Sequence, residues 1–104
     1  MNKRILSIEL TLKDNTKILL DNIEEYNLHI SNSIYGDMLW IDTTKIPDTS
    51  SFKKKCIKNV LIRDKDKVSN LQCRLKLDRY NERKNDMCEK ATLCFSGKIK
   101  GVID

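Results

Sequence analysis

The residue types that most often act as acid–base groups, nucleophiles or metal ligands are scarce here: the chain has one histidine and four cysteines. His29 lies in an alternating stretch, on the polar side with Asn27 and Ser31. With no second histidine, most metal and catalytic-triad arrangements are unavailable. We therefore expect His29 to be an ordinary surface residue, and we assign no catalytic residue.

The four cysteines are Cys56, Cys73, Cys88 and Cys94. None of them forms a Cys-x-x-Cys pair, the spacing on which structural zinc sites are usually built. Cys73 alternates with leucines and is expected in the core, whereas Cys88 lies in a polar stretch and is expected to be the most exposed thiol. We therefore expect reduced thiols, with no metal and no cofactor.

Basic residues form the candidate anion-binding set: Lys53, Lys54, Lys55, Lys58, Arg79 and Arg83. Lysine clusters attract phosphate groups, although a lysine-rich face can also serve only solubility. The Arg-x-x-x-Arg spacing of the two arginines is similar to that of cyclic-dinucleotide-binding PilZ barrels. In that family the pair precedes the barrel and an Asp/Asn-x-Ser-x-x-Gly motif follows; here the pair comes late and residues 94–99 do not match. The two guanidinium groups could still hold a phosphate.

Charge is unevenly distributed along the chain. Residues 14–42 contain six acids and one base, a net charge of −5, and residues 43–63 contain six bases and one acid, a net charge of +5. The acidic segment, with its tryptophan, is the candidate partner-binding set: Asp21, Glu24, Glu25, Asp37, Trp40 and Asp42. Alternatively, the two segments pair across a sheet and neutralise each other.

The elements that must position these residues are strands. Residues 6–13, 26–31, 71–78 and 91–96 alternate apolar and polar side chains, which is typical of strands with one buried and one wet face. The pattern assigns the following residues to packing: Leu6, Ile8, Leu10, Leu12, Tyr26, Leu28, Ile30, Leu71, Cys73, Leu75, Leu77, Leu93 and Phe95.

The other segments complete a mainly β domain. Residues 17–22 and 59–63 read as strands, the latter in a hairpin with 68–79, and residues 38–41 read as a central strand, apolar on both faces. Residues 51–58 have helical spacing and predict a short helix. Residues 81–90 read as a surface loop, and residues 91–96 as a strand that could stand at an edge. We expect a single-domain antiparallel β barrel or sandwich of about six to seven strands, covering residues 1–104.

The composition excludes some classes of protein but does not identify the function. The chain has 104 residues, 34% of them charged, and a net charge of +5. No segment is apolar enough to span a bilayer or serve as a signal core, so we expect a cytoplasmic protein without membrane partners. The abundance of lysine, asparagine and isoleucine is typical of an AT-rich bacterial or phage genome, so we expect a bacterial or phage-infected cell.

Three classes of function are compatible with these features. The first is a non-enzymatic protein-binding module, such as a phage or mobile-element product that occludes a host protein. The second is a nucleic-acid or nucleotide binder that uses the lysine run, and the third, with least support, is an enzyme. The expected partners are a host protein or a second copy of the chain, which could pair through an edge strand.

Overall fold

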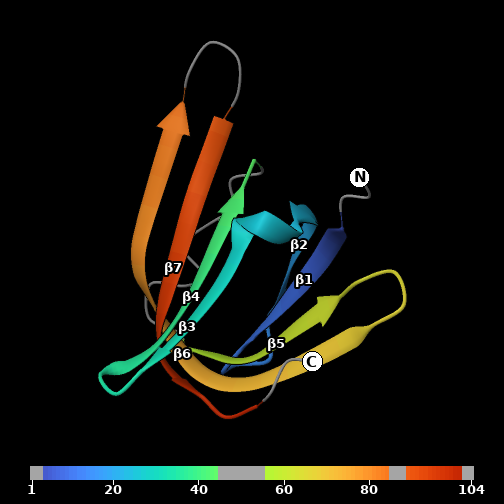
Figure 1. Ribbon diagram of the computed structural model, residues 1–104. Helices are drawn as coiled ribbons and strands as arrows, with labels where there is room; N and C mark the ends of the chain where they lie inside the picture. Colours follow the sequence, from blue (N-terminus) through green and yellow to red (C-terminus); the bar gives the residue numbers. More distant parts are fainter. Residues whose placement is uncertain (1–3, 45–55, 85–88, 102–104) are drawn as a thin grey trace.

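The computed structural model describes residues 4–44, 56–84 and 89–101, and within these ranges seven strands form one open antiparallel sheet (Figure 1). The strands are β1 (Ile5–Leu12), β2 (Lys17–Glu24), β3 (Leu28–Ser33), β4 (Gly36–Thr43), β5 (Ile57–Arg63), β6 (Val68–Lys84) and β7 (Glu89–Ile99), and a 3-10 turn η1 (Glu25–Asn27) joins β2 to β3. Their order in the sheet is β2-β1-β5-β6-β7-β4-β3. The expected fold class is confirmed.

The core lies on one face of the sheet, as the alternation predicts. On β1, Leu6, Ile8, Leu10 and Leu12 are all buried, and the side chains between them are not. Buried residues of the other strands meet them in a single apolar cluster: Leu20, Ile23, Leu39, Ile41, Ile57, Val60, Ile62, Leu71, Cys73, Leu75, Leu93 and Phe95. Removing this apolar surface from water is the main term that stabilises the fold.

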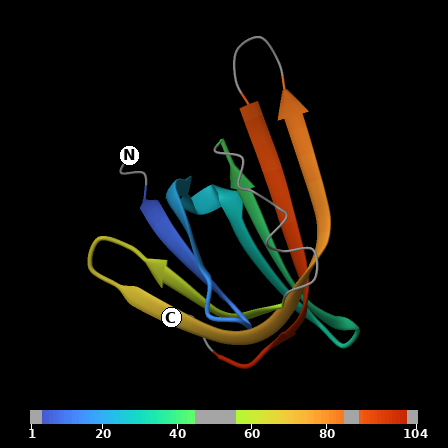
Figure 2. The same ribbon diagram turned by 180° about the vertical axis from the view of Figure 1, so that it is seen from behind.

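The sheet bends along its two longest strands, β6 and β7, so that β3 and β4 face β1 and β2 across the core (Figures 1 and 2). Two irregularities accompany the bend. The β6–β7 register shifts between Leu77 and Arg79, and Gly97 has a φ of 154°. A Cβ added at Gly97 would lie 2.0 Å from the backbone oxygen of Arg74, so only glycine allows the two strands to approach here.

The edges of the sheet are β2 and β3, not the strand that we expected at an edge. Residues 91–96 belong to β7, which is paired on both sides, with β6 and with β4. Local sequence does not reveal this position, because the β4–β7 pairing joins residues far apart in the chain. The expectation that residues 91–96 offer an edge for a second copy is therefore wrong.

Two packing predictions fail near η1. Tyr26 was expected inside but is 65% exposed, because η1 interrupts the alternation and β3 begins only at Leu28. Ile30 does point to the core side, opposite Leu39, but it is 37% exposed because β3 is an edge strand that no neighbour covers.

Two predicted segments also differ from the structure. Much of the expected loop over residues 81–90 is strand, because β6 continues to Lys84 and β7 begins at Glu89. Of the expected helix over residues 51–58, Ile57 and Lys58 belong to β5, and residues 51–55 lie outside the described residues. Pairing of β5 with both β1 and β6 outweighs the helical spacing.

Candidate functional site

The outward face of β6 and β7 carries the largest gathering of bases in the described part of the chain. We call it the β6–β7 basic face, and it consists of Arg74, Lys76, Arg79 and Arg83 on β6 with Lys90 and Lys98 on β7. All six residues are exposed, and they alternate with buried residues such as Leu75 and Leu93. The one acid on this outward face of the two strands is Asp78, at the irregularity in β6.

Two pairs of like charge lie directly opposite each other on this face. Arg74 is the register partner of Lys98, and Arg83 is the partner of Lys90. Side chains opposite each other on antiparallel strands are close enough for like charges to repel. Within the described residues, none of these four side chains forms a hydrogen bond or an ion pair.

Arg79 covers the centre of the face. Its guanidinium lies over the Trp40 ring, 5.2 Å from the ring centroid, and its Nε lies 3.3 Å from Asp78 Oδ2. Cys94 stands between Trp40 and Arg79 in the register and is 1% exposed. Burial raises the pKa of the Cys94 thiol, an effect that the charge of Arg79 partly opposes, so Cys94 is not an activated nucleophile.

The structure brings part of the predicted anion-binding set together. Arg79 and Arg83 share the β6–β7 basic face, whereas Lys58 lies on β5 and donates a hydrogen bond to Asn15. Lys53, Lys54 and Lys55 lie outside the described residues.

Sequence reasoning missed four members of this face: Arg74, Lys76, Lys90 and Lys98. The signal for Arg74 and Lys76 was available, because the alternation of residues 71–78 already places both on the wet side of one strand. The cross-strand pairs were not available, since they depend on the register between β6 and β7.

The predicted partner-binding acids are distributed over the structure, and most of them have bonds within the protein. Glu24 and Asp42 line one pocket, and Glu25 lines another. Asp21 accepts a hydrogen bond from Ser7, and Asp42 accepts one from Thr92 at 2.6 Å. Glu25 forms an ion pair with Arg4. In addition, β5 pairs with β1 and β6, so Lys58 does not lie opposite a strand of the acidic segment.

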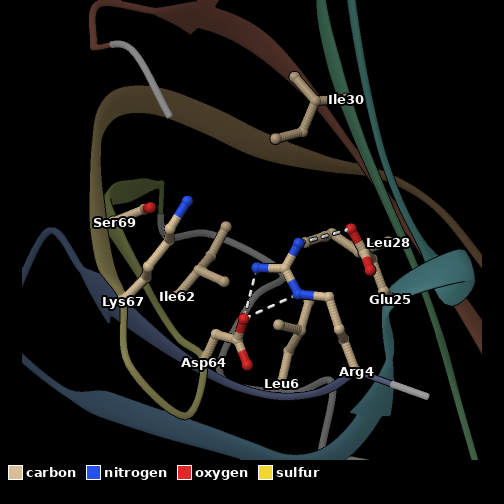
Figure 3. Close-up of a pocket in the computed structure, with 9 residues that line it drawn as sticks. All are labelled: Arg4, Leu6, Glu25, Leu28, Ile30, Ile62, Asp64, Lys67 and Ser69. Atoms are coloured by element: carbon tan, nitrogen blue, oxygen red, sulfur yellow. Dashed lines mark hydrogen bonds and ion pairs between the residues drawn. The ribbon is translucent and has the colours of Figure 1, made fainter. Parts of the chain in front are cut away.

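A pocket of about 260 Å³ marks the place where the bent sheet remains open (Figure 3). Leu6, Leu28, Ile30 and Ile62 form its apolar walls. Arg4 reaches across it, donating to Asp64 Oδ2 through Nε at 2.8 Å and to Glu25 Oε1 at 3.2 Å. These two contacts, which we call the Arg4 latch, join the start of β1 to η1 and to the β5–β6 turn.

The Arg4 latch changes the titration of its carboxylate. The hydrogen bond from Arg4, helped by the Lys65 backbone N–H and the Arg4 charge, lowers the pKa of Asp64. Conversely, Asp64 raises the pKa of Arg4. The charged side chains of this pocket are thus largely occupied with each other.

A second pocket, of about 480 Å³, collects residues from both predicted sets: Glu24, Asp42 and Arg83. Its wall also contains Tyr26, whose phenol pKa is raised by a hydrogen bond to Glu24 and by the charge of that carboxylate. The other charged lining residue is Lys90, so two acids and two bases share the pocket. Its mixed charges do not favour an anion or a cation.

Among the described residues, the large apolar side chains with the greatest exposure lie at the tip of the β3–β4 hairpin. Ile34 and Tyr35 are each 92% exposed at the turn between the strands, and the hairpin projects from the body of the sheet (Figure 1). Neither residue was singled out from the sequence, because two apolar residues in a short turn carry no periodic pattern.

Comparison with protein-family models, curated proteins and solved structures found no match. No helix among the described residues is both long and apolar enough to cross a membrane. Within the same ranges, no three potential metal-ligating side chains of histidine, cysteine, aspartate or glutamate gather closely enough to hold an ion.

Proposed function

We propose that the protein is a binding module that docks the tip of its β3–β4 hairpin into an apolar pocket of a partner protein. The observation that carries this proposal is the 92% exposure of two adjacent large apolar side chains, Ile34 and Tyr35. Isolated exposed apolar residues are common on protein surfaces, but a projecting pair of this kind is typical of an interaction site.

Hydrogen bonds around the turn order its backbone before any partner binds. Ser33 Oγ accepts the Tyr35 N–H at 3.2 Å and donates to the Gly36 carbonyl at 2.8 Å. Below the turn, Asn32 donates to Asp37 at 3.0 Å. A turn whose backbone is already ordered loses less conformational entropy on binding, which favours affinity.

The base of the hairpin is fixed to the neighbouring strand. Asp37 accepts the backbone N–H of Ile99 at 2.7 Å, and this bond is the main reason why the pKa of Asp37 is lowered. The hairpin is therefore attached to β7 at its base, while its tip projects from the sheet.

The partner chemistry follows from the tip and its surroundings. Tyrosine is enriched among interface residues that dominate binding energy, and its hydroxyl can meet a polar group at the end of an apolar pocket. Ser31, Asn32 and Ser33 on the adjoining edge strand are exposed and provide a polar rim. We propose that docking acts by occlusion, in which this small chain blocks the partner surface that it covers.

A comparison of variants tests the proposal. The wild-type protein, an Ile34→Ser/Tyr35→Ser variant and a Val68→Ser control are immobilised, and each is exposed to a bacterial lysate. Val68 is also an exposed apolar residue but lies at the start of β6. We expect one partner to be retained by the wild type and the control and lost by the tip variant. With that partner purified, Tyr35→Ala should raise Kd by about 30-fold, which corresponds to about 2 kcal/mol.

Two results would contradict the proposal. One is a purified partner that binds the tip variant as tightly as the wild type. The other is a wild-type protein that retains no partner but binds neutral lipid vesicles through Ile34 and Tyr35, which would assign the tip to a membrane surface.

A further inference from the structure

We infer that the β6–β7 basic face binds the phosphate backbone of a duplex nucleic acid, independently of its sequence. This surface does not include Ile34 or Tyr35, although Lys98 lies near the base of the hairpin, and the inference goes beyond the protein-binding function proposed above. It rests on three features of the described residues: like charges opposite each other, their succession along β6 and β7, and the covered aromatic ring at the centre.

The like charges are the first feature. Arg74 opposite Lys98 and Arg83 opposite Lys90 place two repulsive pairs on one ribbon. Like charges directly opposite each other destabilise a sheet, and the repulsion is relieved when an anion lies between them. Acids of neighbouring strands lie near both pairs, because the charge of Lys98 helps to lower the pKa of Asp37, and Glu24 and Asp42 line a pocket with Arg83 and Lys90. On the outward face of β6 and β7 themselves the one acid is Asp78, so the excess of bases there still favours an anionic partner.

Their succession along the strands is the second feature. Arg74, Lys76, Arg79 and Arg83 follow the outer side of β6 through the bend of the sheet, so at the usual rise per residue the path along the strand is about 25–30 Å. Lys90 and Lys98 run parallel to them on β7. A duplex presents a phosphate about every 3.4 Å along each strand, so it meets several of these bases on the outer side of the bend and all six only if its path follows the bend. The series of bases therefore favours an extended polyanion over a single phosphate.

The covered ring is the third feature, and it favours a duplex over a single strand. Proteins that bind single strands usually offer free aromatic rings on which unpaired bases stack. On this part of the surface the ring available is Trp40, and Arg79 lies over it at 5.2 Å. None of the other outward side chains of β6 and β7 is aromatic; besides the bases, Asp78 and Val68, they include Asn81, Thr92 and Ser96. The face thus offers charge to a backbone without offering stacking to bases.

Fluorescence anisotropy with a labelled DNA duplex of arbitrary sequence tests the inference. If the six bases contact phosphates, the logarithm of the association constant should fall against the logarithm of salt concentration with a slope of about −5. The Lys76→Gln/Lys98→Gln variant should bind on the order of tenfold more weakly at low salt, and its slope should be shallower by about 2. Urea unfolding of each variant checks that it is folded.

The matched control is Lys65→Gln/Lys67→Gln, which removes the same number of charges from the exposed β5–β6 turn. It should bind like the wild type. Equal weakening by both double variants would overturn the inference, because net charge alone would then account for binding. So would the absence of duplex binding at low salt, or tighter binding to the corresponding single strand. The Ile34→Ser/Tyr35→Ser variant should retain duplex binding, which keeps this result separate from the test of the hairpin tip.

Discussion

Arg74 on β6 and Lys98 on β7 lie directly opposite each other, and both side chains are exposed. Because like charges at this distance repel each other, the pair lowers the free energy of unfolding of the unbound protein. Charge reversal by Arg74→Glu places opposite charges across the ribbon and should raise the free energy of unfolding by about 0.5–1 kcal/mol in urea denaturation at low salt. The gain should shrink as salt is added. An Arg74→Glu protein that is less stable than the wild type would contradict the repulsion, and Arg74→Gln should lie between the two.

Gly97 should be the least replaceable glycine in the described part of the chain. Gly97→Ala combines a φ of 154° with a Cβ that would lie 2.0 Å from the Arg74 oxygen, so it should lower the free energy of unfolding by about 3 kcal/mol or more. Gly36→Ala is the matched control, because its φ is 133° but the nearest heavy atom to the added Cβ is 3.6 Å away. It should cost about 1–2 kcal/mol, the effect of backbone strain alone. Equal losses in urea unfolding would show that overlap at Gly97 is unimportant.

Acid should weaken the fold partly through the Arg4 latch. Since the pKa of Asp64 is lower in the folded protein than in the unfolded chain, its contribution is present at pH values above about 4 and is lost as the pH falls through the folded value. In Asp64→Asn the decline in the urea midpoint below pH 5 should be shallower than in the wild type. Asp66→Asn, in the same turn but outside the latch, should keep the wild-type decline. Identical acid profiles for all three proteins would exclude a role for the latch.

Thiol reactivity should separate the cysteines by burial. In a Cys88→Ser background, Cys56 should react with an aromatic disulfide reagent in the native protein, because it is the half-buried member of the described cysteines. Burial raises the pKa of Cys73 to about 11, and burial also raises that of Cys94, so both should react only on unfolding. The absorbance of the released thiolate, measured with and without urea, gives the number of cysteines that react in the native and in the unfolded protein. Rapid native reaction of Cys94 would contradict its enclosure between Trp40 and Arg79.

The sequence predicts the faces of the strands well and their neighbours poorly. Alternation along β1 correctly places Leu6 through Leu12 in the core, because a side chain's face depends only on its position in its own strand. Neighbour relationships such as Leu39 with Phe95 depend on contacts across most of the chain. For this reason residues 91–96 were expected at an edge, whereas β7 lies inside the sheet.

For the candidate surfaces, too, local sequence predicts the face of a residue but not its neighbours on other strands. Arg79 and Arg83 were selected for their spacing, and they do share a face. Their relation to Lys90 and Lys98 depends on the register shift between Leu77 and Arg79, which sequence does not reveal. Ile34 and Tyr35 are recognisable only once the projecting hairpin is known, because exposure is a property of the assembled sheet.

The placement of η1 has a consequence for how fast the chain reaches this structure. It joins β2 and β3, which are consecutive in the chain but stand at opposite edges of the sheet. The β1–β2 and β3–β4 hairpins are local and can form early, but β1 must wait for β5, and β4 must wait for β7. A sheet completed by such distant pairings has a high contact order, and chains of this kind fold in milliseconds to seconds rather than microseconds. We therefore expect the β1–β2 and β3–β4 hairpins, which the three residues of η1 connect, to form before strands β5 to β7 join them into one sheet.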